Sequence, residues 1–360
     1  MQSTAQSVVA TLWRQSLVAR WISWPGAILL VAACINAITA RDASAQAPTA
    51  AGDWDRIVAA AKKEGKVVLY HVAVPPVMAR LKAEFEKLYP GIAIEETRMP
   101  GSVIMSKFDQ ERAQSADGAD GTISAELLWL EARAKEGSLK APVGPARNYP
   151  PAYMLGGVAP VVALEPLIMA VNTNLIKTEV TKYQDLLRPE FKGKIGASEP
   201  FSTLVVAWYN WIEKTQGPDF LPRLAAQAPR FYTGAVPTTQ AAASGEVAIS
   251  LYSVASVVNP LIEKGAPLKI VVPEPNLATS YVAAAFAWAK RPNAALVFLD
   301  YIMSRQGQTT WHGKGESASP LPGVAGSLNP ATINVFDPRP FPSNAAQAYR
   351  EKWTVQFKRP

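Results

Sequence analysis

Polar side chains follow several short apolar runs of this sequence, in places where they could bind a small molecule. The richest place is Ser198-Glu199-Pro200-Phe201-Ser202-Thr203, which comes after the run 194–197 and precedes a segment with helical periodicity. Hydroxyls and free backbone N–H groups at a helix start can hold a carboxylate or phosphonate, and the hydroxyls can equally cap the helix themselves. Ser198, Ser202 and Thr203 are therefore candidate ligands for an organic anion.

Other places of the same kind each have a plainer interpretation beside the functional one. The candidates are His71 with Ala73, Arg98 with Ser102, Ser124, Tyr252 with Ser253, and, more weakly, Glu274. Arg98 and the helix start at Gly101-Ser102 could hold an anion, or they could be a solvated cation beside an ordinary N-cap. His71 could contact a ligand or be a satisfied histidine in a surface loop. Tyr252 could offer its ring or hydroxyl to a ligand or pack at the edge of a core.

Alternating strand and helix patterns must position these side chains. The first apolar run is 66–70, and a helical pattern of Met78, Leu81, Phe85 and Leu88 follows Pro75-Pro76. A second strand is expected from Ile92, and a second helix from Gly101 to Ala113. Later strands are expected over 167–171, 194–197, 247–251, 268–272 and 281–288, and helices over 293–303 and 345–357. The alternation predicts an α/β protein with a mostly parallel sheet covered on both faces, and ligands of such sheets lie beyond the carboxyl ends of the strands.

The first 45 residues resemble a secretory signal peptide. Arg14 and Arg20 precede a short apolar run, and Ala43-Ser44-Ala45 offers a small-residue cleavage site. The run that ends at Cys34 also fits a lipoprotein cleavage box, and an uncleaved anchor helix is a further alternative. We favour cleavage after Ala45, which leaves no cysteine and predicts a periplasmic protein.

The remaining 315 residues are more than one hydrophobic core usually serves, which indicates two lobes. The whole chain carries a formal charge of +7, of which residues 1–45 contribute +2. Lysines and arginines are scattered rather than clustered with aromatic residues, so we do not expect nucleic-acid binding.

Several stretches, in order and with similar spacing, resemble one family. They are Ala83-Glu84-Phe85-Glu86-Lys87-Leu88-Tyr89-Pro90-Gly91-Ile92, Val171-Asn172-Thr173-Asn174-Leu175, the segment 183–195, Gly265-Ala266-Pro267, and Pro292-Asn293-Ala294-Ala295 with Phe298-Leu299-Asp300-Tyr301. Together they resemble the extracellular solute-binding proteins of ABC importers, in the group that includes ferric-ion, thiamine, polyamine and phosphonate binders.

The resemblance implies a two-lobe type II periplasmic-binding fold with the ligand in a cleft between the lobes. Lobe one would comprise 54–166 and 280–360, lobe two 174–275, and the crossover segments 167–173 and 276–288. The implied function is to capture a solute, expected here to be an organic anion such as a carboxylate or phosphonate, and to deliver it to a permease in the inner membrane. We expect a monomer without a cofactor.

Ferric-ion binding is the first alternative, and the residue types argue against it. Iron-binding members place adjacent tyrosines where this chain has Ala255 and Ser256, and a third-loop acid where it has Ala125, with Glu126 one residue away. A lone Tyr252 does not supply the several hard oxygen donors that ferric iron requires. An enzyme on this fold is a weaker alternative, because the sequence shows neither a nucleophile elbow nor zinc-ligand spacing. A receptor that signals through a partner cannot be separated from a transport protein at this stage.

Overall fold

Strands and helices alternate along the chain in the computed structural model, which describes residues 51–339 and 343–357. The expected signal peptide and Cys34 lie outside these residues. Within the described ranges, none of the helices combines the length and the apolar character needed to cross a membrane.

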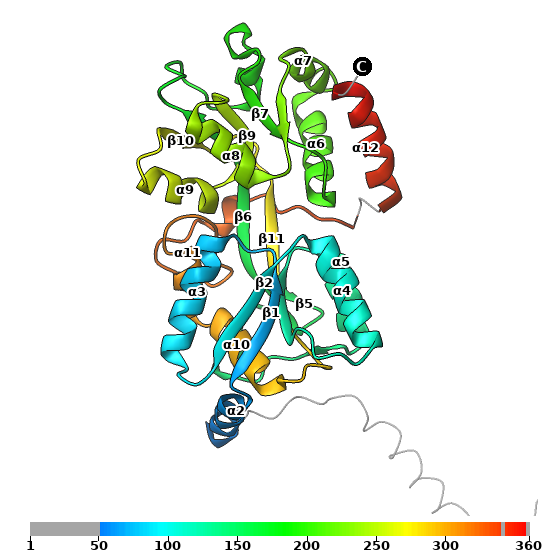
Figure 1. The fold of residues 1–360 in the computed structure, drawn as a ribbon, viewed down its shortest axis with the longest axis vertical. Coiled ribbons are helices and arrows are strands. Elements are labelled where there is room, and N and C mark those ends of the chain that lie inside the picture. Colours follow the sequence, from blue (N-terminus) through cyan, green and yellow to red (C-terminus); the bar gives the residue numbers. More distant parts are fainter. Residues whose placement is uncertain (1–50, 340–342, 358–360) are drawn as a thin grey trace, which may run out of the picture. The chain divides into compact units, whose positions relative to one another are not determined.

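Lobe one contains a parallel strand pattern with helices on both faces (Figure 1). Its elements are α2 (Ala51–Glu64), β1 (Lys66–His71), α3 (Pro75–Leu88), β2 (Ala93–Arg98), α4 (Gly101–Ala113), β3 (Gly121–Ser124), α5 (Leu127–Lys135), β4 (Leu139–Lys140), β5 (Met154–Leu155), α10 (Pro292–Met303) and α11 (Arg305–His312). Strands β2, β1 and β3 pair in parallel in that order. Apolar residues of α3 and α10 form a core on one face, and those of α4 and α5 form a second core on the other.

Lobe two repeats this plan. Its elements are β7 (Ile195–Ser198), α6 (Thr203–Gln216), α7 (Phe220–Ala226), β8 (Arg230–Tyr232), α8 (Ala235–Ser244), β9 (Ile249–Val254), α9 (Ala255–Glu263) and β10 (Leu268–Val271). Strands β8, β7 and β9 pair in parallel. Helices α8 and α9 cover one face of these strands, while α6 and α7 cover the other.

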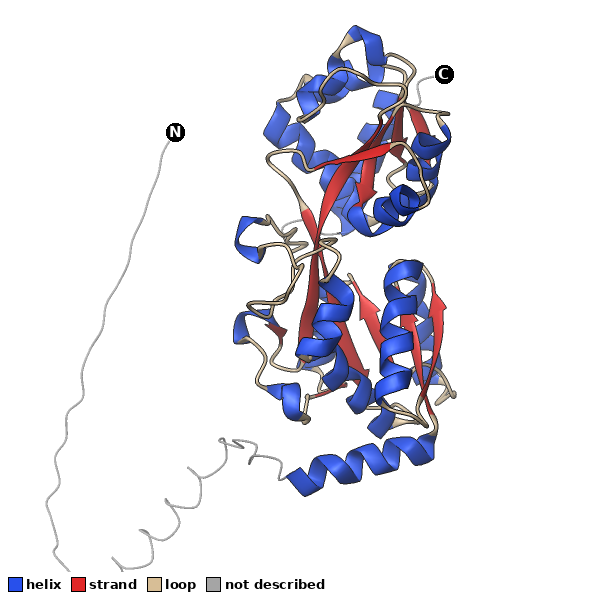
Figure 2. Ribbon diagram, turned by 90° about the vertical axis from the view of Figure 1, so that its left-hand side faces the viewer, coloured by secondary structure: helices blue, strands red, loops and turns tan. Residues whose placement is uncertain are grey.

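Two strands connect the lobes, β6 (Ala159–Asn172) and β11 (Ala278–Phe286), and they pair antiparallel with each other (Figure 2). Residues 161–166 of β6 pair with β11, and the next residues pair with β9 of lobe two. Strand β11 continues along β3 of lobe one. The register shifts in both ladders, beside Tyr281 and beside Ile168, which indicates local irregularities of the β-bulge type.

The observed strand β6 begins eight residues before the expected one. The apolar pattern of its first half is interrupted by Pro160, Glu165 and Pro166, so hydrophobic periodicity alone does not predict a strand there. The structure buries this half between its neighbours and satisfies Glu165 with hydrogen bonds. Local sequence alone does not contain those partners.

Helix boundaries follow signals that act within one turn of the chain. Helix α3 begins with Pro75, whose fixed φ suits the first turn, and α4 begins at Gly101 as expected. The Ser202 hydroxyl caps α6 by accepting the Val205 N–H at 3.3 Å. Helix α8 ends at Gly245, which has a φ of +82°, in the left-handed region that glycine enters without steric cost.

The last described helix, α12 (Ser343–Phe357), packs on lobe two. Trp353 is buried against Tyr209 of α6 and Phe231 of β8, with ring centroids 5.7 and 4.8 Å apart. The expected lobe one includes all of 280–360, whereas α12 contacts α6 and α7 of lobe two. Its apolar face covers aromatic rings of lobe two, which the linear order of elements does not reveal.

Candidate functional site

The carboxyl ends of strands from both lobes converge on one part of the connecting strands. We call residues 161–167 of β6 and 278–282 of β11 the junction. Ser124, the last residue of β3, pairs with Val282, and Val254, the last residue of β9, pairs with Leu167. Because parallel strands end at the same edge, the carboxyl ends of their neighbours lie at this edge too. Most candidate residues from the sequence therefore come to the two sides of the junction.

His71 and Arg98 end adjacent strands of lobe one. The His71 side chain is buried; its Nε2 lies at hydrogen-bond distance, 2.6 Å, from Glu96 Oε2, and its Nδ1 is buried without a hydrogen-bond partner. Burial lowers the pKa of His71, and the nearby Glu96 carboxylate opposes the shift. His71 is therefore a buried histidine, not the surface-loop residue of the plainer interpretation.

Arg98 is exposed, and its Nε donates to the backbone carbonyl of Ala73 at 3.1 Å. This bond holds the guanidinium group beside the loop after β1 and does not use its terminal nitrogens. Among the described residues, no carboxylate lies at ion-pair distance from Arg98. Ala73 contributes through its backbone carbonyl, while its methyl group is buried.

The start of α4 holds a carboxyl group of the chain itself. Ser102 is exposed in the first turn, and a Cβ added to Gly101 would collide with the Glu126 carboxyl group. Burial raises the pKa of Glu126. Ser124 is buried, and its hydroxyl accepts the Glu126 N–H at 3.2 Å, so it shapes the turn that carries this carboxyl group.

The serines before α6 have local partners. Ser198 is fully buried, and its hydroxyl donates to the Glu199 carbonyl at 3.2 Å. Ser202 caps α6, and Thr203 is half-buried in the first turn. The capping interpretation thus holds for Ser202, although a cap does not prevent the free N–H groups of the same turn from contacting a ligand.

Tyr252 and Ser253 lie inside β9, because this strand continues to Val254 rather than ending at Leu251 as expected. Successive side chains of a strand point to opposite faces. Tyr252 packs edge-on against Trp208 of α6, with centroids 5.0 Å apart, whereas the Ser253 hydroxyl lies 2.5 Å from that of Thr239 in α8. Ser253 is fully buried on the α8 face, so the structure turns it away from the side of the sheet that Tyr252 occupies.

Glu274 is exposed in the loop between β10 and β11. Neither an ion pair nor a side-chain hydrogen bond joins it to another described residue. The structure does not bring it together with the strand-end candidates through any such contact.

Sequence reasoning missed a carboxyl group in the junction itself. Glu165 of β6 is only 3% exposed; it accepts hydrogen bonds from Tyr281 of β11, at 2.8 Å, and from Ser256 in the first turn of α9. Burial raises the pKa of Glu165 to about 7, against the effect of both hydroxyl donors. A glutamate inside the run Val161-Val162-Ala163-Leu164-Glu165-Pro166-Leu167-Ile168 was the available signal.

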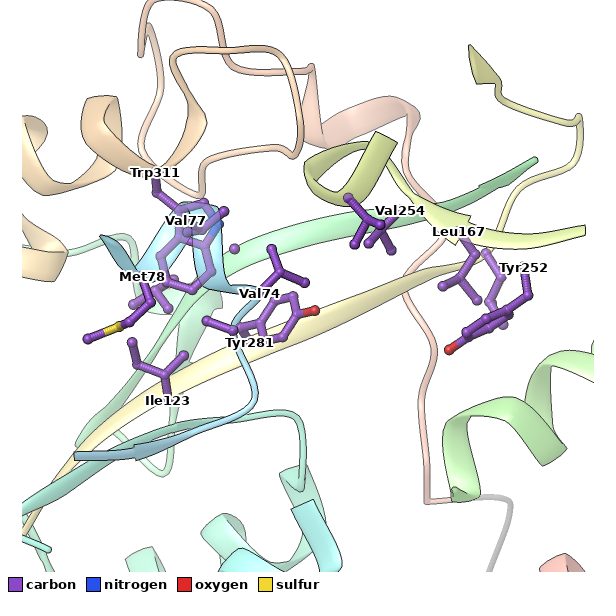
Figure 3. Packing of buried hydrophobic residues seen from close by; sticks show 14 of the residues in the cluster. Val74, Val77, Met78, Ile123, Leu167, Tyr252, Val254, Tyr281 and Trp311 are labelled. Carbon is purple, nitrogen blue, oxygen red and sulfur yellow. The ribbon is translucent and has the colours of Figure 1, made fainter. Parts of the chain in front are cut away.

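Tyr252 and Tyr281 complete the polar surface near Glu165. Figure 3 shows their hydroxyls directed toward the space between the two rings. Burial raises the pKa of both tyrosines, and the Glu165 carboxylate adds to each shift. The positive charge of Arg98 acts on Tyr281 in the opposite direction, which places this cation in the electrostatic neighbourhood of the junction.

Ser256, which the resemblance aligns with one of the paired tyrosines of iron-binding members, donates its hydroxyl hydrogen to Glu165. Among the residues that the structure describes, no three side chains of the His, Cys, Asp or Glu type are grouped so that they could hold a metal ion. The arrangement that does exist is a pair of hydroxyl donors, Tyr281 and Ser256, on the Glu165 carboxyl group, and Arg98 acts electrostatically on Tyr281.

Comparison with known proteins now defines the class. The chain belongs to the bacterial extracellular solute-binding protein family, which it matches over residues 67–315. The resemblance inferred from the sequence is thereby confirmed. Among curated protein sequences, none matches the chain.

Solved structures of two-lobe binding proteins share the fold. The substrate-binding protein of an ABC transporter from Agrobacterium tumefaciens is 16% identical, with a TM-score of 0.72 over 83% of this chain and 97% of that one. AfuA from Actinobacillus pleuropneumoniae, with fructose-6-phosphate bound, is 21% identical, with a TM-score of 0.65 over 82% and 100%. Iron-bound HitA from Pseudomonas aeruginosa is 19% identical, with a TM-score of 0.61 over 80% and 99%.

Proposed function

We propose that this protein is the periplasmic substrate-binding component of an ABC importer and that it captures a small organic anion, such as a carboxylate or phosphonate. Membership of the solute-binding family supports the transport role. A neighbour of the same fold is described as the binding protein of an ABC transporter, and another binds a sugar phosphate. In this role the protein binds its solute as a monomer and then delivers the solute to a permease in the inner membrane.

The anion assignment rests on the hydrogen bonding of Arg98. Its Nε donates to the Ala73 carbonyl, so the guanidinium group is held in place by a neutral acceptor and keeps its positive charge. A guanidinium group binds carboxylates and phosphonates through paired N–H donors, and such charge-assisted bonds are stronger than neutral ones. An arginine fixed at the carboxyl end of a strand is therefore suited to an anionic ligand.

Hydroxyl groups extend this surface. Tyr252 lies against Trp208 with no described residue bonded to its hydroxyl, and Ser102 is exposed at the start of α4. These groups can donate to the oxygens of a bound anion. The Glu126 carboxyl group lies against Gly101, and in its ionised form it would disfavour an anion at that point of the helix start, because two carboxylates in contact repel each other.

Ferric-ion binding is the second candidate, because HitA has this fold and binds iron. The geometry favours it less, since Ser256 replaces a tyrosine ligand and is already bound to Glu165. Ferric iron prefers several charged oxygen donors, and the Tyr252 hydroxyl has a pKa raised by burial, which opposes the ionisation that iron binding would require.

A thermal-unfolding screen separates these functions. The protein purified from the periplasm is screened against di- and tricarboxylates, phosphonates, sugar phosphates, polyamines and Fe(III). A ligand at about 100 times its Kd stabilises by about 2.7 kcal/mol, which corresponds to a Tm increase of about 5 °C. We expect such a shift with a member of one anion class.

Variants connect the shift to Arg98. Arg98→Ala should abolish it, while Arg56→Ala, an exposed arginine on α2, should leave it unchanged. A shift with Fe(III) alone that Tyr252→Phe removes would establish the iron alternative. Stabilisation by a polyamine would overturn the anion assignment, because a polycation requires carboxylates rather than Arg98.

A further inference from the structure

Glu165 connects the two crossover strands to lobe two at the point where β6 changes partners. It is opposite Thr279 in the ladder with β11, and two residues later Leu167 pairs with Val254 of β9. Its two hydrogen bonds reach Tyr281, 116 residues along the chain, and Ser256, 91 residues along. Glu165 therefore joins β6 both to the other crossover strand and to the first turn of α9 in lobe two.

Charged and titratable groups face Glu165 from every element packed around it, and none of them is a cation in direct contact. Tyr281 comes from β11, Tyr252 from β9, and Glu316 from the segment after α11. Arg80 of α3 pairs with Glu316. Arg98 of β2 acts on Tyr281 rather than on Glu165 itself.

Glu316 makes an ionised Glu165 still less favourable. It is 1% exposed, and its Oε1 has no hydrogen-bond partner although its other oxygen is paired with Arg80. A second buried carboxylate nearby disfavours the charged form of Glu165, as burial does. A protonated Glu165 can still bond both hydroxyls, since a hydroxyl can donate or accept.

We propose that Glu165 is a proton-linked latch between the lobes: its protonated form holds α9 against the crossover strands, and its ionised form loosens this contact. An ionised carboxylate gains solvation when water reaches it, so it favours arrangements in which Ser256 moves away from β6. The neutral acid has no such gain and keeps the packed arrangement. The latch is independent of which solute binds, and it makes lobe movement responsive to pH near neutrality.

Distance measurements between spin labels test the latch directly. Labels are placed on cysteines introduced at Ala83 of α3 and Lys264 after α9, both exposed, in a chain carrying Cys34→Ser. We expect the native distance distribution to change between pH 5.5 and 8.5, with a midpoint close to pH 7. Glu165→Gln should give one distribution at all pH values, and Glu190→Gln, an exposed acid of lobe two, should behave as the native protein.

Ser256→Ala distinguishes proton linkage from a merely structural contact. Its hydroxyl lowers the pKa of Glu165, so its removal should move the midpoint to higher pH while the transition persists. A native distribution that does not respond to pH would overturn the proposal. So would a Glu165→Gln protein that keeps the native midpoint, or a Ser256→Ala midpoint that stays in place.

Discussion

Replacing Glu165 with glutamine should change how the stability of this protein depends on pH. The native pKa of Glu165 is about 7, raised by burial from its ordinary value of 4.5. In the unfolded chain the group loses its proton near pH 4.5, whereas in the folded protein it keeps the proton to about pH 7. Its stabilising contribution is therefore complete below pH 4.5, is lost as the pH rises to about 7, and is constant above that.

The magnitude follows from the two pKa values. At about 1.4 kcal/mol for each tenfold change in proton affinity, the free energy of unfolding should lose about 3 kcal/mol through this group across the interval. Glutamine keeps the shape but cannot ionise. The difference in unfolding free energy between the native protein and Glu165→Gln should therefore change by about 3 kcal/mol from pH 4.5 to 7.5.

Urea unfolding followed by circular dichroism measures this difference. Both proteins are titrated at several pH values, with Glu190→Gln as the control for loss of an exposed carboxylate. Other groups, such as Asp300 with its pKa raised to about 6 by burial, are present in all three proteins and cancel in the comparison. Parallel pH profiles for the native protein and Glu165→Gln would refute the reasoning, whatever the stability of either protein at one pH.

Three further outcomes follow from other buried groups. Asp120→Asn should destabilise by about 3–5 kcal/mol, because the fully buried carboxylate pairs with Arg291 Nε at 2.7 Å and accepts the Val68 N–H; a loss under 1 kcal/mol in urea unfolding would contradict this. His312 is buried and its pKa is lowered to about 4, so acid should remove about 3 kcal/mol of stability between pH 6.5 and 4. Urea unfolding of His312→Gln at several pH values should lack that dependence, and a profile parallel to that of the native protein would contradict the prediction. Trp208→Ala should lower the free energy of unfolding by about 3–5 kcal/mol, because it leaves a cavity where the fully buried ring packs. Thermal unfolding measures this loss, and Lys264→Ala, a truncation of an exposed side chain, is the control.

Short-range patterns were sufficient for much of the secondary structure. The bounds of α4 were predicted to the residue, and α10 and α12 within two residues, because proline, glycine and apolar periodicity act within a few turns. The prediction ends strand β9 at Leu251, because the polar side chains of Tyr252 and Ser253 indicate the end of a strand. Their burial on opposite faces shows that both are strand residues.

The sequence by itself determined the two-lobe α/β plan, its family and the positions of Arg98, Ser102 and the α6 cap near strand ends. Only the tertiary structure decided which of these groups are left for a ligand. Arg98 has no carboxylate partner among the described residues, whereas the Ser253 hydroxyl is hydrogen-bonded to that of Thr239. It also decided that Glu165 meets partners 91 and 116 residues away, because hydrogen bonds and desolvation depend on distance in space, which periodicity along the chain does not encode.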